Sequence, residues 1–206
     1  MRLLILGAAG RTGRLLVDQA LAAGYTVTGF ARSKDETGVE IPGIATIVGD
    51  ARNLDDLTNA LKGQDAVIST LGSSRPGDRV IAASISSLIA AARAQGVKRV
   101  IIMSSFLVAD NFQPNPIIKL ALKVMGSIVA DFKSGEQLLM QSDLDYTIVY
   151  ATRLTNDPLN SQYRIINPDD SVGAGDSISR ANVAEFLLKQ LSDKTYIRKT
   201  VLITGK

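Results

Sequence analysis

The stretch Leu3-Leu4-Ile5-Leu6-Gly7-Ala8-Ala9-Gly10-Arg11-Thr12-Gly13 joins a short apolar run to a glycine-rich turn. Apolar side chains then recur at helical spacing over residues 12–23, so the turn lies between a predicted strand and a predicted helix. Glycines at such a turn let the backbone approach a pyrophosphate, while the helix N-terminus supplies unpaired N–H groups. The stretch therefore predicts a dinucleotide site, although the same glycines could merely shape the turn. The residues predicted to line this site are Gly7, Ala9, Gly10, Arg11, Thr12 and Gly13.

Short apolar strands alternate with helices along the sequence, which is typical of βαβ units stacked into a parallel sheet. The predicted strands span residues 3–6, 25–30, 44–48, 65–70, 99–104, 146–150 and 200–204. The predicted helices span residues 12–23, 54–61, 80–95 and 181–191. We therefore expect the α/β class, with one Rossmann-type domain over residues 1–206 that contains a doubly wound parallel sheet and helices on both faces.

The composition excludes several kinds of site. The 206 residues include no cysteine and no histidine, which excludes disulfides, Cys/His zinc sites, cysteine nucleophiles and histidine bases. The adjacent acidic pairs 55–56 and 169–170 lack metal-loop spacing, so no metal is expected. The net charge of +3 comes from scattered basic residues, which gives no sign of a nucleic-acid partner. No run approaches the roughly 20 apolar residues of a membrane span, and we expect a cytoplasmic protein.

The end of the second predicted strand, about 20 residues beyond the glycine turn, decides between NAD and NADP. An acidic residue there would bind the ribose 2′-hydroxyl and repel a 2′-phosphate. This chain has Gly29-Phe30-Ala31-Arg32-Ser33-Lys34 instead, with no acid before Asp35. Arg32, helped by Arg11, can pair with a phosphate, so NADP(H) is favoured over NAD(H). The alternative is that Arg32 is an ordinary solvated arginine.

Further motifs carry a family resemblance. They are Gly49-Asp50 after the third strand, Gly63-Gln64-Asp65-Ala66-Val67-Ile68 into the fourth, and Ser142-Asp143-Leu144-Asp145-Tyr146-Thr147-Ile148-Val149 into the sixth. With the glycine turn, they make the chain resemble the atypical short-chain dehydrogenase/reductases of the NmrA-like group. Within that group it is similar to the biliverdin-IXβ reductase/flavin reductase family. The resemblance covers essentially the whole chain, but the subgroup rests on overall layout.

The resemblance implies a set of cofactor contacts. Asp50 would accept a hydrogen bond from the adenine amino group, although it could instead cap the following helix. Ser104 corresponds to the serine beside the nicotinamide and is the expected catalytic residue, with Ser105 next to it. The hydroxyl of Ser104 could alternatively only tie down the strand end. The residues implied on the adenosine side are Asp50, Ala51, Thr70, Leu71 and Gly72.

The segment after the sixth strand is expected to pass the nicotinamide carboxamide. It contains Tyr150, Ala151 and Thr152, where relatives often carry Arg-Pro or Pro-Pro. Tyr150 could equally be a packing residue. Phe106 and Arg153 are the residues expected to meet the substrate. Arg153 could attract an anionic acceptor or form a surface ion pair.

The usual Tyr-x-x-x-Lys pair of short-chain dehydrogenases is missing. Aligning Glu136 with the family's helix glutamate puts Ile128 and Phe132 at the positions of that pair, and Lys133 lies one residue, or about 100°, out of register. Alcohol dehydrogenase, epimerase and dehydratase chemistry loses support for this reason. Hydride transfer needs no protein acid where the acceptor takes its proton from water.

A wide apolar stripe covers residues 117–129 at helical spacing. The apolar surface of this stripe is wider than a helix needs in order to pack against one sheet. The stripe fits a buried core helix, a wall for a planar acceptor, or a contact between the subunits of a homodimer.

Together these observations predict an NADPH-dependent oxidoreductase that passes hydride to a planar, small-molecule acceptor such as a flavin, a quinone or a biliverdin-like tetrapyrrole. The alternative is a non-catalytic, NmrA-like redox sensor that binds NADP(H) and reports its state to a partner protein. The absence of the Tyr-x-x-x-Lys pair is compatible with both the reductase and the sensor.

Overall fold

The structure is a computed structural model that describes residues 1–32, 41–72, 79–109, 125–167, 170, 172–173 and 175–206. In this part of the chain, eight strands form one sheet in the order β3-β2-β1-β4-β5-β6-β10-β8. Neighbouring strands are parallel except β8, which runs antiparallel to β10. The strands of this sheet are β1 (Arg2–Leu6), β2 (Thr26–Ala31), β3 (Ala45–Val48), β4 (Ala66–Ser69), β5 (Arg99–Ser105), β6 (Asp145–Ala151), β8 (Tyr163–Ile166) and β10 (Lys199–Gly205).

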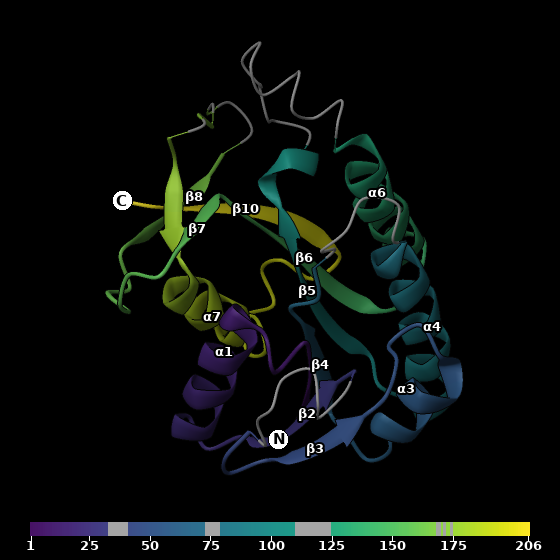
Figure 1. Ribbon diagram of the computed structural model, residues 1–206. Helices are drawn as coiled ribbons and strands as arrows, with labels where there is room; N and C mark the ends of the chain where they lie inside the picture. The colour runs from purple at the N-terminus through teal and green to yellow at the C-terminus, as the bar shows by residue number, and fades with distance from the viewer. Residues whose placement is uncertain (33–40, 73–78, 110–124, 168–169, 171, 174) are drawn as a thin grey trace.

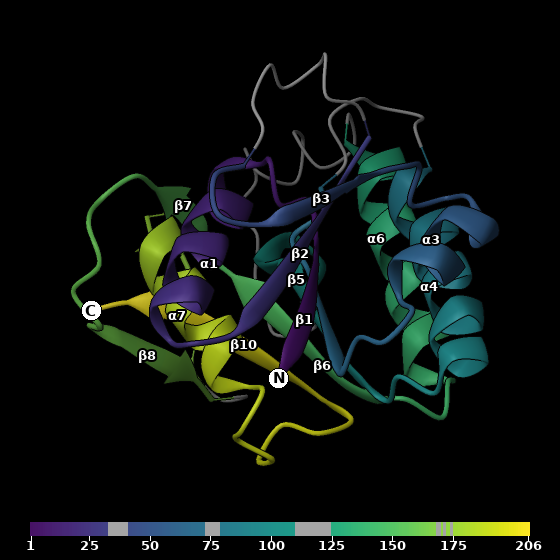
Figure 2. The ribbon, with the colours of Figure 1, turned by 90° about the horizontal axis from the view of Figure 1, so that it is seen from below.

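Helices cover both faces of the sheet (Figures 1 and 2). One face carries α1 (Arg11–Ala22) and α7 (Arg180–Lys189), and the other carries α3 (Leu54–Ala60), α4 (Val80–Gln95) and α6 (Gly126–Met140). The predicted Rossmann-type, doubly wound fold is confirmed. The strand order reverses direction between β1 and β4, and ligands of such sheets bind at the carboxyl ends of the strands beside that reversal.

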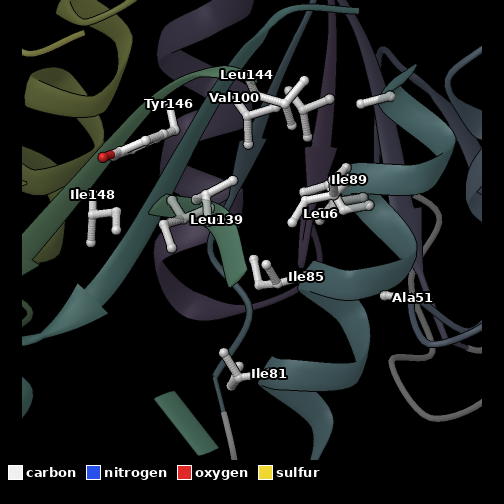
Figure 3. Packing of buried hydrophobic residues seen from close by; sticks show 14 of the residues in the cluster. Leu6, Ala51, Ile81, Ile85, Ile89, Val100, Leu139, Leu144, Tyr146 and Ile148 are labelled. Carbon is white, nitrogen blue, oxygen red and sulfur yellow. The ribbon is translucent and has the colours of Figure 1, made fainter. Parts of the chain in front are cut away.

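Alternation along the central strand explains why the sheet has two covered faces. Leu3 and Ile5 of β1 belong to the core under α1 and α7, whereas Leu4 and Leu6 belong to the core under α3, α4 and α6. Figure 3 shows the second core, with Leu6 among side chains of α4, α6 and β6. All four β1 leucine and isoleucine side chains are at most 1% exposed, and each full burial stabilises the fold by about 1.5–3 kcal/mol.

Some elements were not among the predicted ones. A second, two-stranded parallel sheet pairs β7 (Arg153–Thr155) with β9 (Ser177–Ser179), and β8 adds the antiparallel edge. These strands have three or four residues, too few to show an alternating pattern. Helix α6 was also absent from the four predicted ranges, although a helix carrying Glu136 was expected. A one-turn 3-10 helix, η1 (Phe106–Val108), follows β5.

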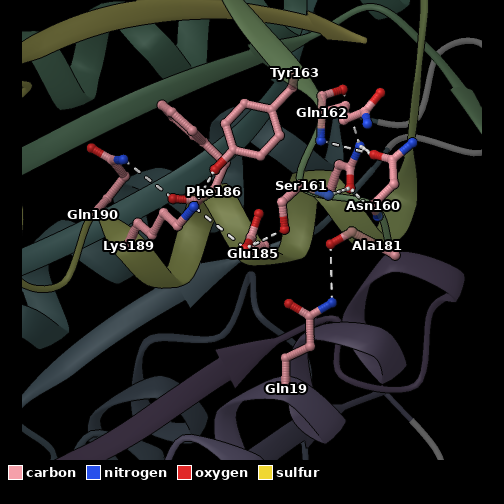
Figure 4. A network of polar contacts seen from close by, with 11 residues as sticks. Gln19, Asn160, Ser161, Gln162, Tyr163, Ala181, Glu185, Phe186, Lys189 and Gln190 are labelled. Carbon is pink, nitrogen blue, oxygen red and sulfur yellow. Dashed lines mark hydrogen bonds and ion pairs between the residues drawn. The ribbon is translucent and has the colours of Figure 1, made fainter. Parts of the chain in front are cut away.

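Polar contacts fasten the chain after β7 to α7 (Figure 4). The Asn182 amide donates to Asn160 Oδ1 at 2.7 Å, and its own Oδ1 accepts from the backbone N–H of Ser161 at 3.1 Å. At the far end of the helix, Lys189 Nζ donates to the Tyr163 hydroxyl at 2.7 Å. Residues 160–163 therefore follow α7 closely, although the sequence of this loop contains no periodic pattern.

The apolar stripe at 117–129 falls largely outside the described residues, since the described chain resumes at Met125. Of its described members, Ile128 and Val129 are half-buried on α6. The expectation of a homodimer through this segment stays a prediction. None of the described helices has the length and apolar character that crossing a membrane requires.

Candidate functional site

The carboxyl ends of β1, β2 and β4 surround a cavity of about 260 Å³, called here the first cavity. It lies beside the reversal of strand order, at the place where the sequence predicted the cofactor. All its lining residues except Phe30 and Ala31 are among the predicted cofactor contacts. They are Gly7, Ala9, Gly10, Phe30, Ala31, Arg32, Ala51, Thr70, Leu71 and Gly72.

The glycine turn lets α1 begin directly against β1. Gly7 has a φ of +79°, which favours glycine, and a Cβ at Gly13 would lie 2.1 Å from the Gly7 carbonyl oxygen. Gly10 caps α1 without a side chain, and the first helical turn contains no acidic residue. No acid of the first turn of α1 therefore neutralises its N–H groups or its positive dipole end. This is the environment that a pyrophosphate requires.

Hydrogen bonds to both neighbouring strands hold the turn in place. The backbone N–H of Thr70 donates to the Leu6 carbonyl at 2.9 Å, and its Oγ1 lies 3.2 Å from Leu6 O and 3.3 Å from Gly7 O. On the other side, the Gly7 N–H donates to the Phe30 carbonyl at 3.2 Å. The turn is thus fixed by β2 and β4, and the side chain of Thr70 supports it.

Asp50 is held by a neighbouring arginine. Arg52 Nη2 lies 2.6 Å from Asp50 Oδ2, and this hydrogen bond, with a further contribution from the charge of Arg32, keeps the pKa of Asp50 below its ordinary value. Asn53 caps α3, with its Oδ1 accepting from the N–H groups of Asp55 at 2.8 Å and Asp56 at 3.2 Å. The alternative interpretation of Asp50 as that cap is therefore wrong.

A second cavity, also of about 260 Å³, opens at the carboxyl ends of β5 and β6. It shares Leu71 and Gly72 with the first cavity, so the two adjoin. Apolar side chains from several elements form much of its wall, and two arginines add positive charge. Its lining residues are Leu71, Gly72, Met103, Ser104, Ser105, Phe106, Phe132, Ala151, Thr152, Arg153, Leu154 and Arg180.

Ser104 belongs to a buried polar cluster. Its Oγ donates to Glu136 Oε1, and the Tyr150 hydroxyl donates to Glu136 Oε2 at 2.8 Å. Ser104, Glu136 and Tyr150 are 5%, 4% and 7% exposed, so solvent hardly reaches these contacts. The cluster joins β5 and β6 to α6. Ser104 therefore holds the end of β5 against α6 through its hydrogen bond to Glu136, and it also lines the second cavity.

The N-terminus of α4 fixes α6, which carries Glu136. Both oxygens of the Asp131 carboxylate accept from the α4 backbone, at 2.9 Å from Ile81 N and 2.9 Å from Ala82 N. Arg79, which precedes α4, offers no capping side chain of its own. Asp131 therefore caps a helix other than its own, and this contact aligns α6 with the end of β5.

Phe132 and Lys133 occupy different environments on α6. Phe132 lines the second cavity, whereas Lys133 is exposed. The helix therefore presents an aromatic side chain to the site, at a position where a dehydrogenase dyad would place a polar one.

Five of the predicted cofactor contacts do not line either cavity. Thr12 and Gly13 are buried beneath the turn, and Tyr150 lies behind Ser104. Those that line neither cavity are Arg11, Thr12, Gly13, Asp50 and Tyr150.

Sequence reasoning missed Arg180 and gave Glu136 no role. Arg180 is the first residue of α7 and follows the cap Ser179, whose Oγ accepts from the Asn182 N–H at 3.1 Å. That cap signal was available in the sequence. The placement of Arg180 in the cavity was not, because it depends on the pairing of β7 with β9.

Comparison with known proteins extends these findings. The model of a family described as NAD(P)H-binding matches residues 7–194. The photosystem II assembly factor Ycf39 of Synechocystis sp. is 30% identical over 219 residues, a match that covers 100% of this chain and 63% of that protein.

Solved structures show the same fold. A short-chain dehydrogenase/reductase from Veillonella parvula in complex with NADP superposes with a TM-score of 0.80 at 23% identity, covering 100% of this chain and 94% of that one. ChuY, an anaerobilin reductase from Escherichia coli O157:H7, gives 0.81 at 21% identity, covering 100% and 97%.

Proposed function

The chain belongs to the NAD(P)H-binding family, and from this membership we propose that it is an NADPH-dependent reductase of planar acceptors such as flavins, quinones or biliverdin-like tetrapyrroles. The membership also confirms the resemblance to atypical short-chain dehydrogenase/reductases of the NmrA-like group. The observation that carries the proposal is the second cavity, with aromatic side chains on its wall and Ser104 in its lining, directly beside the first.

The described residues fit a dinucleotide. In this proposal the first cavity holds the adenosine half, with the uncapped start of α1 facing the pyrophosphate and Arg32 facing a 2′-phosphate. Among the described residues, no carboxylate lies within ion-pair distance of Arg32, and Asp50, whose pKa the charge of Arg32 helps to lower, is bonded to Arg52 instead. These features support NADP(H) over NAD(H).

Ser104 and the backbone of residues 151–152 orient the nicotinamide half in the second cavity, and Tyr150 acts from behind through its hydrogen bond to Glu136. Glu136 fixes the rotamer of Ser104 from behind, so its oxygen is presented in one position. The hydroxyl of Thr152 is engaged with Thr204 at 3.0 Å, which leaves the backbone at 151–152 as the contacting surface. Bound NADPH supplies the hydride, and the planar acceptor takes the accompanying proton from water.

The apolar wall of the second cavity suits a flat ring system. Phe106 and Phe132 can pack on an aromatic acceptor, and Met103 and Leu154 exclude water around it. ChuY is described as an anaerobilin reductase, and a reductase of this fold lends support to an acceptor of the tetrapyrrole kind. The cytoplasmic location expected from the sequence remains a prediction.

A redox sensor is the second candidate. The observation in its favour is that the Ser104 hydroxyl already donates its hydrogen bond to Glu136 and that Phe132 replaces a dyad residue, so none of the described lining residues is a dehydrogenase acid. A sensor would bind NADPH and leave every acceptor unreduced.

A screen of NADPH oxidation separates the two candidates. The protein is mixed with NADPH and, in turn, FMN, menadione and biliverdin, while NADPH binding is measured by calorimetry in parallel. Acceptor-dependent oxidation supports the reductase. Tight NADPH binding with no oxidation above the protein-free rate, for any acceptor, would favour the sensor.

A further inference from the structure

Arg180 places a buried positive charge in the wall of the second cavity. It is 8% exposed, and its Nη1 donates to the Thr155 carbonyl at 3.0 Å and to Asn156 Oδ1 at 2.7 Å. These bonds fix the guanidinium against the chain after β7. Throughout the described ranges, no carboxylate lies within ion-pair distance of it, and Nε and Nη2 have no hydrogen-bond partner.

Burial without a counter-ion is unfavourable for a guanidinium. The pKa of Arg180 is lowered, first by burial and then by the positive charge of Arg11. A buried arginine normally has an anionic partner, because desolvation of an unpaired charge costs free energy. A ligand anion would supply that partner.

Arg153 brings a second positive charge to the same cavity. It is the first residue of β7, and the parallel pairing of β7 with β9 sets Thr155 beside Ser179, immediately before Arg180. The nearest acids in the sequence are engaged elsewhere, since Asp157 accepts from Thr155 Oγ1 at 2.6 Å and Asp176 accepts from Gly173 N at 2.8 Å. Arg153 forms no ion pair within the part of the chain described.

We propose that Arg153 and Arg180 form an anion site that recognises a phosphate or carboxylate carried by the planar acceptor. The inference rests on the proposed function, because it takes the second cavity as the acceptor site. The cofactor's own phosphates are the other possible source of the anion. They have the start of α1 and Arg32 at the first cavity, and neither Arg153 nor Arg180 lines that cavity.

FMN and riboflavin test the proposal, because they share one ring system and differ by a phosphate. Binding of each flavin to protein saturated with NADP⁺ is followed by quenching of flavin fluorescence. We expect FMN to bind about tenfold or more tightly than riboflavin, as for a charge-assisted contact. Arg153→Ala should reduce that ratio, because one of the two charges of the site is lost, and it should weaken riboflavin binding much less than FMN binding. Arg2→Ala, at the opposite end of β1, serves as the control.

Arg180 requires a milder change because its bonds also hold the chain after β7. Arg180→Lys keeps the charge but loses the planar fork, so the FMN-to-riboflavin ratio should fall partway, with the melting temperature measured alongside. Equal binding of the two flavins by the unaltered protein would overturn the proposal. So would an equal loss of both flavins in Arg153→Ala, or a loss of NADPH affinity with the flavin ratio intact.

Turnover is scored separately from binding. FMN that binds in an Arg153-dependent way but is not reduced by NADPH would retain the anion site and refute the reductase. Reduction of FMN and riboflavin with equal efficiency and equal affinity would retain the reductase and refute the anion site.

Discussion

In the proposed cofactor site, Arg32 distinguishes NADPH from NADH, because it lines the first cavity directly after β2 and forms no ion pair within the described residues. Replacing Arg32 with Ala removes the charge that meets the 2′-phosphate. NADPH affinity should fall about tenfold or more, whereas NADH affinity should barely change. Calorimetry with both cofactors checks this, with Arg2→Ala as the control. An equal loss for NADPH and NADH would show that Arg32 has a structural role.

Ser104 is expected to position the nicotinamide rather than to supply a proton. Ser104→Ala should slow turnover by much less than the roughly 100-fold or more that follows the loss of a general acid. In the unaltered protein, hydride transfer should be nearly flat between about pH 6 and 8, since the chain has no histidine. A bell-shaped profile that Glu136→Gln removes would contradict this and assign the proton to Glu136.

Substitution of Gly13 should affect the stability of the fold, whereas substitution of Gly72 should affect NADPH binding. A Cβ at Gly13 would collide with the Gly7 carbonyl at 2.1 Å, whereas a Cβ at Gly72 has no atom of the described residues within 4 Å. Gly13→Ala should therefore destabilise the fold by about 1–3 kcal/mol or more. Gly72→Ala should leave unfolding in urea unchanged and weaken NADPH binding, because Gly72 lies where the two cavities meet. Equal unfolding midpoints for the two variants would contradict this assignment.

Helices α4 and α6 are joined by the Asp131 carboxylate of α6, which accepts two hydrogen bonds from the first turn of α4. Asp131→Ala removes the acceptor for two α4 N–H groups, and losing a cap of this kind costs about 0.5–2 kcal/mol. Urea unfolding should show that loss, with Asp131→Asn closer to the unaltered protein. Asp18→Ala, on the exposed side of α1, is the matched control. A loss no larger than that of Asp18→Ala would mean that Asp131 does not support α4.

Four of the five described α-helices and the strands β1–β6 and β10 were predictable, because helical spacing or an apolar run marks each of them, whereas α6 was not among the predicted ranges. The seven predicted strands correspond to β1–β6 and β10, and β1 shows why: its alternating leucine and isoleucine side chains fill two cores. Strands β7, β8 and β9 were not predicted, because each has only three or four residues in which polar side chains interrupt any apolar run.

The site was predictable to a similar extent. The glycine turn, Arg32 and residues 70–72 fall on the first cavity because local sequence fixes strand ends. Glu136 and Arg180 reach the second cavity only through the docking of α6 and the pairing of β7 with β9, which no local pattern encodes. The positions of Glu136 and Arg180 at the second cavity are therefore set by tertiary contacts and not by a sequence motif.

Across the whole molecule, the fold brings the glycine-lined first cavity and the second cavity, with its apolar wall and two arginines, together at one edge of the sheet. Loops from both halves of the doubly wound sheet contribute to them, as the reversal of strand order requires. Cofactor and acceptor would thus meet beside Ser104, where β4, β5 and β6 end.

Direct hydride transfer from the nicotinamide to the acceptor inside the second cavity is tested by single-turnover reduction of FMN with NADPH deuterated at C4. We predict a primary isotope effect on flavin reduction for deuterium on one face of the nicotinamide only, with that deuterium lost from the cofactor. Equal rates for both deuterated forms and unlabelled NADPH, or no reduction of FMN, menadione or biliverdin while NADPH binds tightly, would contradict direct hydride transfer.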